Sequence, residues 1–79
     1  MAKSVRVFVT LKRGVLDPQG SAVGRSLRAL GYSEIQDVRL GKYIELSVDG
    51  DDRQVKQRVE EMCQKLLANT VIEDYRIEL

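Results

Sequence analysis

Hydrophobic and polar side chains alternate along three stretches of this 79-residue chain, which is the pattern of β-strands covered on one face. In residues 3–12 the valines share one face, and Phe8 lies on the other. Residues 35–49 alternate in the same way, and so does the stretch 71–79. The alternation therefore predicts at least three strands.

The stretch 35–49 fits two structures. One is a hairpin with a three-residue loop around Gly41, in which Leu40 faces Ile44. The other is one long strand that bends at Gly41 and whose far half pairs with a second copy of the chain. Both stay open, because the apolar side chains before and after Gly41 have the same parity.

A helix is predicted between the first two strands. Asp17 and Pro18 are typical of an N-cap followed by the first helical position, and Gly31 is a natural stop. Gly20 and Gly24 lie beside the apolar stripe of this helix, so we expect another backbone to approach closely there. The stripe consists of Val23, Leu27 and Leu30.

A second helix is predicted after residue 51. Asp51 and Gln54 have the spacing of a capping box, and Asn69 is expected to end the helix in a left-handed conformation. Apolar residues at helical spacing should face the sheet. They are Val55, Val59, Met62, Cys63 and Leu66.

These elements follow the order β-α-β-(β)-α-β. We expect one domain over residues 1–79, an α+β two-layer sandwich of ferredoxin-like type with both helices on one face of the sheet. The other sheet face is then bare and carries Phe8 and Tyr43. In so small a domain, large apolar groups on an uncovered sheet face predict self-association, as a dimer or a tetramer.

Composition narrows the function. One cysteine and no histidine leave no intrachain disulfide and no zinc site of the usual kind. A net charge of +1 is too small for binding nucleic acid or anionic lipid through bulk electrostatics. No apolar run reaches the roughly 18 residues of a membrane span. Since a lone thiol fits a reducing compartment, we expect a cytoplasmic protein without a nucleic-acid or membrane partner.

We expect no catalytic, cofactor-binding or metal-binding residue on the chain. The lack of histidine removes the commonest general base. Cys63 falls on the inner stripe of the second helix, where a thiol is structural. The run 20–26 departs from a phosphate-binding loop in its glycine spacing and in having arginine where that loop needs lysine. Capping accounts for the carboxylates around Asp51.

Three polar segments exceed what folding requires, and they carry a resemblance to a known family. The chain resembles the small S subunit of phosphoribosylformylglycinamidine synthase, the PurS family. The matching segments are residues 15–20, residues 36–39 with 41–43, and residues 62–63 with 65–75.

The resemblance implies a non-catalytic subunit in de novo purine biosynthesis. In the family, a glutaminase subunit releases ammonia. A large synthetase subunit uses ATP and Mg²⁺ to add that ammonia to formylglycinamide ribonucleotide. The S subunit forms dimers or dimers of dimers, bridges the two larger subunits and assists ammonia transfer. ATP and Mg²⁺ would then bind the large subunit, and no cofactor would bind this chain.

The residues expected at subunit interfaces come from the bare sheet face and the three matching segments. They are Phe8, Asp17, Pro18, Gln19, Gly20, Arg39, Gly41, Lys42, Tyr43, Asn69, Thr70 and Tyr75. Local roles as caps, bends and turns suit the same residue types. Two other functions stay open from the residues alone. One is a small regulatory module that binds an amino acid between protomers, and the other is an RNA-binding module that stacks bases on the sheet aromatics.

Overall fold

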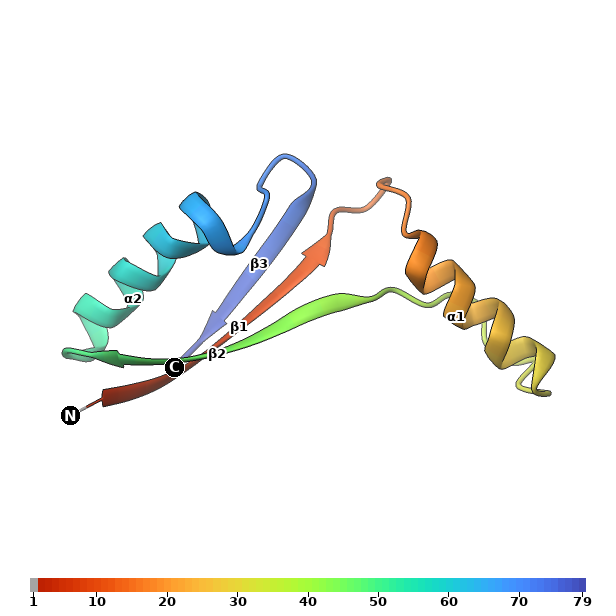
Figure 1. Ribbon diagram of the computed structural model, residues 1–79, viewed down its shortest axis with the longest axis horizontal. Coiled ribbons are helices and arrows are strands. Elements are labelled where there is room, and N and C mark those ends of the chain that lie inside the picture. Colours follow the sequence, from red (N-terminus) through yellow and green to blue (C-terminus); the bar gives the residue numbers. More distant parts are fainter. Residues whose placement is uncertain (1) are drawn as a thin grey trace.

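Residues 2–79 are described by a computed structural model, in which a small sheet carries one helix on its face and a second helix beyond its end (Figure 1). In chain order the elements are β1 (Ala2–Leu11), α1 (Pro18–Ala29), β2 (Gly41–Asp49), α2 (Asp52–Met62), the π-helical turn η1 (Cys63–Leu67) and β3 (Glu73–Glu78). This arrangement confirms the α+β class. No helix among these residues has both the length and the apolar character needed to cross a membrane.

The three strands form an antiparallel sheet in the order β2-β1-β3. In its register, Phe8 on the central strand lies opposite Tyr43 on one neighbour and Arg76 on the other. Because side chains alternate between faces, these three share one face, and the valines of β1 share the other. The predicted strand alternation is confirmed. The bounds of β1 and β3 differ from the prediction by one or two residues, whereas β2 begins six residues later than the predicted stretch 35–49.

Of the two structures left open for residues 35–49, the hairpin around Gly41 is wrong. Gly41 begins β2 and pairs with Thr10, and residues 35–40 form no strand within the protomer. A Cβ at Gly41 would lie 2.5 Å from the carbonyl oxygen of Val9, so the glycine allows a close approach of two strands rather than a turn. Pairing of residues 35–40 with a second copy stays a prediction.

The core lies between the valine face of the sheet and α2. Burying each of these valines contributes about 1.5–3 kcal/mol relative to leaving it exposed. Tyr75, Ile77 and the apolar side chains of β2 pack around this centre and are partly buried. The fully or nearly fully buried residues are Val5, Val7, Val9, Val55, Val59, Cys63 and Ala68.

Leu66 was predicted to face the sheet, but it lies outside the core, and 83% of it is exposed. The reason is the π-helical turn, in which the N–H of Ala68 donates to the carbonyl oxygen of Cys63 at 3.0 Å, five residues back. This wider turn shifts the helical register. Ala68 enters the core in place of Leu66, and Leu66 points into solvent.

The predicted helix ends are confirmed except one. Asp51 and Gln54 form the capping box, and Gly31 stops α1 with a φ of +105°. Asn69 is not left-handed, because every residue with positive φ between 2 and 79 is a glycine. It follows the π-helical turn in a different role, as a side-chain cap described below.

The position of α1 differs from the two-layer expectation. Within one protomer α1 lies beyond the end of the sheet rather than on its face (Figure 1). The Cα radius of gyration is 16.0 Å, whereas a compact chain of this length would have about 12 Å. The molecule extends over 48 × 25 × 14 Å. The apolar stripe of α1 is therefore only partly covered, and Leu30 at its end is 75% exposed.

Gly20 and Gly24 differ in what surrounds them, and this yields a first prediction. A Cβ at Gly20 would press on the Val38 carbonyl oxygen and lie 2.5 Å from a carboxylate oxygen of Asp17. At Gly24 it would meet the Val38 side chain at 3.5 Å and the Arg28 guanidinium at 3.6 Å, which are ordinary contacts. Gly20→Ala should therefore destabilise the fold by about 1–3 kcal/mol. Gly24→Ala should stabilise it by up to about 1 kcal/mol through helix propensity.

Urea unfolding at a fixed protein concentration measures both effects. Gly24→Ala serves as the matched control, since it introduces the same methyl group one turn along the same helix. Equal changes in unfolding free energy for the two variants would contradict the close approach at Gly20.

Candidate subunit interface

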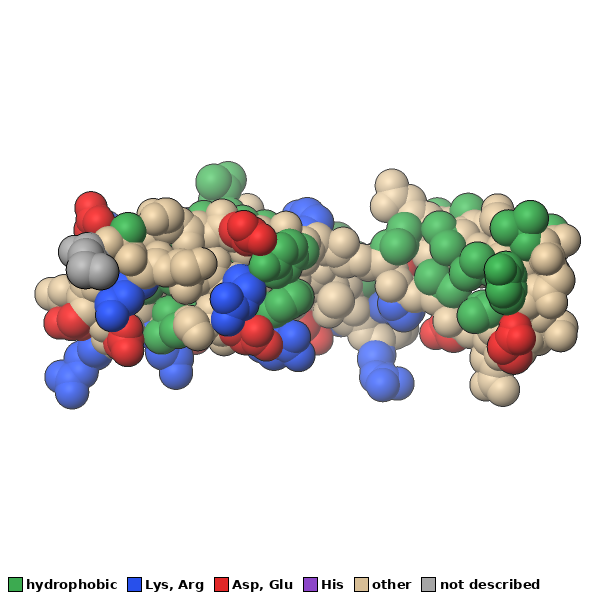
Figure 2. Space-filling view, turned by 90° about the horizontal axis from the view of Figure 1, so that it is seen from below, with side chains coloured by type: hydrophobic (Ala, Val, Ile, Leu, Met, Phe, Trp, Pro, Cys, Tyr) green, Lys and Arg blue, Asp and Glu red, His purple; other side chains and the backbone are tan. Residues whose placement is uncertain are grey.

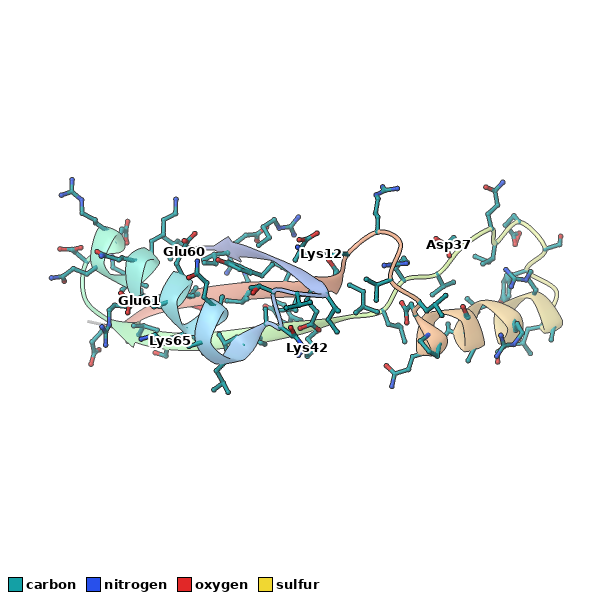
Figure 3. The ribbon with its side chains drawn as sticks, turned by 90° about the horizontal axis from the view of Figure 1, so that it is seen from above. Lys12, Asp37, Lys42, Glu60, Glu61 and Lys65 are labelled. Carbon is teal, nitrogen blue, oxygen red and sulfur yellow. The ribbon has the colours of Figure 1, made fainter. Side chains whose placement is uncertain are left out.

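Two chain segments connect the sheet to α1, and we call them the neck: residues 12–17 and 38–40. The segment between them, residues 18–37, is the arm. Figure 3 shows Lys12 and Lys42 at the end of the sheet nearest the arm, and Asp37 on the arm. The neck contains two of the residues predicted from the sequence, Asp17 and Arg39, and Gly20 lies three residues beyond its first segment.

Arg39 holds the two neck segments together. Its guanidinium donates to the carbonyl oxygens of Leu11 and Lys12, both at 3.1 Å, and to that of Val15 at 3.4 Å. These carbonyls belong to the end of β1 and the turn after it. A planar guanidinium presents several spread-out donors in a fixed geometry, so it can bind three carbonyls at once. The compact ammonium group of a lysine could not reach all three.

Asp17 connects the arm to the sheet. One carboxylate oxygen accepts from the N–H of Gly20 in the first turn of α1, and the other accepts from the N–H of Leu40 beside β2, each at 2.8 Å. The side chain is buried. These hydrogen bonds, first from Gly20 and then from Leu40, hold the pKa of the Asp17 carboxyl below its ordinary value, and the charge of Arg39 adds to the effect.

A shallow groove of about 230 Å³ at the neck brings together residues from all three segments that the resemblance marked. Gln19 and Lys42 line it, and Lys42 forms an ion pair with Glu73 at 3.8 Å. Pro18, the first residue of α1, is exposed nearby. The first two segments therefore meet in space. The third contributes Glu73 rather than the residues predicted from it.

The remaining candidates have local roles within the protomer or show no role there. They are Asn69, Thr70 and Tyr75. The side-chain oxygen of Asn69 accepts from the N–H of Val71 at 3.2 Å, which caps the turn before β3. Thr70 is exposed. Tyr75 packs against the core on the covered face of the sheet, with its hydroxyl 3.5 Å from the amide nitrogen of Gln64.

The open face of the sheet carries Phe8 and Tyr43 together, as predicted. Their ring centroids lie 5.2 Å apart, and the Arg76 guanidinium carbon lies 4.5 Å above the Phe8 ring. Arg76 was missed by sequence reasoning, although its register opposite Phe8 follows once β3 is aligned. Glu45 and Glu78 share this face and offset the charges of Arg6 and Arg76, which leaves little net attraction for the phosphates of RNA.

Two apolar surfaces remain uncovered on the protomer. One is the arm, where Leu30 and Tyr32 are exposed; Figure 2 shows hydrophobic side chains gathered over this end of the molecule. The other is a groove of about 320 Å³ between β2 and the end of α2, lined by Leu46, Met62 and Leu66 among others. Figure 3 places Glu61 of α2 and Lys65 of η1 along the same side of this helical segment. The groove was not predicted, because the π-helical turn that exposes Leu66 has no simple sequence signal.

The described residues contain no catalytic constellation. Cys63 is fully buried, and burial raises the pKa of its thiol, with a further contribution from the negative charge of Glu60. A neutral, inaccessible thiol is a poor nucleophile. Among residues 2–79, no three Cys, Asp or Glu side chains come together in a way that could hold a metal ion.

The fold and these surfaces define a class of protein: a small α+β domain with a projecting helical arm whose apolar side chains are partly exposed. The sequence profile of the family described as PurS, phosphoribosylformylglycinamidine (FGAM) synthase, matches residues 4–79. The chain belongs to the PurS family.

Individual relatives agree with this assignment. The phosphoribosylformylglycinamidine synthase subunit PurS of Bacillus subtilis is 60% identical over 75 residues, which cover 95% of this chain and 89% of that protein. The crystal structure of PurS from Methanocaldococcus jannaschii has a TM-score of 0.88 at 42% identity, covering 99% of this chain and 94% of that one. A chain in the structure of PurLQS from Thermotoga maritima has a TM-score of 0.91 at 29% identity, covering 99% and 96%.

The hydrogen bonds of Asp17 predict a specific acid sensitivity. Since the pKa of Asp17 is lowered in the folded state, its ionised form stabilises the fold above the ordinary value of 3.8. That contribution is lost as the pH falls below 3.8 towards the folded pKa. Asp17→Asn should lower the thermal midpoint at pH 7, because an amide offers only one acceptor oxygen for two N–H donors. The midpoints of variant and wild type should converge in acid.

Thermal unfolding between pH 2 and pH 7 tests this, with Asp37→Asn as the matched control. Asp37 is exposed on the arm and makes no hydrogen bond or ion pair with residues 2–79, so its variant should follow the wild type. If Asp17→Asn and Asp37→Asn gave the same curve, the assigned role of Asp17 would be refuted.

Proposed function

We propose that this chain is the non-catalytic S subunit of a phosphoribosylformylglycinamidine synthase. As a homodimer, it bridges the glutaminase subunit and the ATP-dependent synthetase subunit and assists ammonia transfer between them. Family membership supports the assignment, as does the structural likeness to a chain of the Thermotoga maritima PurLQS structure. The observation that carries the bridging role is the arm, which extends an amphipathic helix with exposed apolar side chains away from its own sheet.

The uncovered surfaces of the protomer suggest how two copies would assemble. Each copy has an exposed apolar arm and an apolar groove of about 320 Å³ beside β2. In a two-fold dimer the arm of each copy covers the groove of the other, since such an interface uses the same pair of surfaces twice. Residues 35–40 would then extend the partner's sheet along β2. This completes the ferredoxin-like lobe that one protomer lacks.

The dimer would place two lobes at a fixed separation, which is a useful property for a bridge. Ammonia released into water is protonated and diffuses away. Holding the site that makes it in register with the site that consumes it therefore raises its effective concentration. ATP and Mg²⁺ would bind the synthetase subunit. The buried, reduced thiol of Cys63 suits the cytosol as the location of this assembly.

Reconstitution with the two larger subunits tests the function. Without this chain, glutamine-dependent synthesis should fall about tenfold or more, and ammonia-dependent synthesis should change less than about twofold. The difference is expected because free ammonia at high concentration needs no transfer between sites. Equal glutamine-driven rates with and without the chain would refute the bridging role.

The arm surface predicts the effect of a charge on dimerisation. Leu30→Asp should weaken self-association about tenfold or more in sedimentation equilibrium, because Leu30 is 75% exposed in the protomer and would be buried in the dimer. Ala29→Asp is the matched control. It introduces the same charge at the same end of α1, outside the predicted stripe. A dimer equally stable in both variants, or a wild type that is monomeric at micromolar concentration, would contradict the proposed assembly.

A further inference from the structure

The direction in which the arm leaves the sheet is set by few contacts. α1 lies beyond the end of the sheet and does not pack on it (Figure 1). The covalent connections alone, residues 12–17 and 38–40, would act as two flexible linkers. Within one protomer, the hydrogen bonds of the neck are therefore the contacts that can fix the angle between arm and sheet.

Arg39 connects the two segments of the neck to each other. Its three carbonyl acceptors lie 24 to 28 residues away in sequence, on the segment that leads from β1 to the arm. The segment that returns from the arm to β2 carries the guanidinium. The outgoing and returning segments are thus bound side by side, and neither can turn independently of the other.

Asp17 connects the start of the arm to the sheet. Its carboxylate binds Gly20 in the first turn of α1 and Leu40 immediately before β2. One buried side chain therefore joins the start of the arm helix to the start of a sheet strand. Gly20 allows this contact, because its missing side chain leaves room for the Val38 carbonyl oxygen. These contacts favour a rigid joint over a flexible hinge at the neck.

We propose that Asp17 and Arg39 are positioning residues that fix the angle of the arm. Through that angle they set the separation of the two lobes of the dimer and of the catalytic subunits that the lobes hold. The second part of this inference rests on the proposed function, and the first part does not. Loss of either side chain should leave a folded sheet lobe with an arm of variable direction.

The first experiment measures the angle directly. Nitroxide labels are placed at Arg25→Cys on α1 and Lys56→Cys on α2, two exposed positions, while the buried Cys63 stays unlabelled. The labelled chain is diluted into an excess of unlabelled wild type, so that only distances within one protomer are recorded. Pulsed electron resonance should give a narrow distance distribution in the wild type. Arg39→Gln should broaden it.

Two further variants sharpen the result. Arg39→Lys keeps the charge but loses the planar fork, so it should also broaden the distribution. Arg13→Gln is the matched control. It removes the same charge from the neck, and Arg13 makes no hydrogen bond or ion pair with residues 2–79. A distribution as narrow in Arg39→Gln and Asp17→Asn as in the wild type would overturn the proposal, because something other than the neck would then hold the arm.

The second experiment measures the consequence in the reconstituted complex, as product formed per glutamine hydrolysed. Complexes with Arg39→Gln or Asp17→Asn should retain ammonia-dependent synthesis but yield about tenfold less product per glutamine, because misplacement of reacting sites wastes ammonia. Arg13→Gln should match the wild type. The ratio is measured only on complexes isolated with full subunit stoichiometry, so a merely destabilised variant leaves it unchanged.

The two proposals fail in different ways. If the wild-type chain does not raise glutamine-dependent synthesis, the proposed function fails, and the distance measurement still decides the role of the neck. If the wild-type chain does raise it and the Arg39→Gln complex couples equally well, the neck does not position the catalytic subunits.

Discussion

The Asp17 carboxylate determines the shape on which the rest of the structure depends. By binding Gly20 with one oxygen and Leu40 with the other, it starts α1 at the point where the chain leaves the sheet and directs the helix outward. A helix held in that direction cannot fold back onto its own strands. The protomer consequently has a small core, formed by the valines of β1 with α2, and an apolar helix without a cover. This geometry favours the proposed self-association, since so small a core leaves little net stability once chain entropy is counted.

Most of the local structure could be predicted from the sequence. Strand alternation, the Asp17 and Asp51 caps and the Gly31 stop depend on residues close in the chain, and each appears where expected. The location of α1 could not be predicted in the same way. An apolar stripe shows that a helix face will be buried, but it carries no information on whether the cover comes from the same chain or from another. The helix pattern is identical in both cases.

The error at Leu66 and the failure of the hairpin alternative at Gly41 have a common physical origin. In each case tertiary packing selected a backbone geometry that local preference did not. The π-helical turn shifts Leu66 outward so that Ala68 can complete the core, and Gly41 serves the contact of β1 with β2 instead of a turn. Among the interface candidates, Asp17 could be identified as a cap from its neighbours. The three carbonyl contacts of Arg39 could not, because their acceptors are distant in sequence.

A subunit without an active site can influence a reaction only through where it holds other groups. The features that matter in such a chain are then geometric, and they are found at this neck. A glycine admits a carbonyl oxygen, a carboxylate joins a helix to a strand, and a guanidinium binds two segments together. None of these groups needs to exchange protons or electrons near neutral pH. The single thiol, Cys63, is likewise buried and neutral. Its place is in the core, and the chemistry belongs to the partners whose spacing this chain would control.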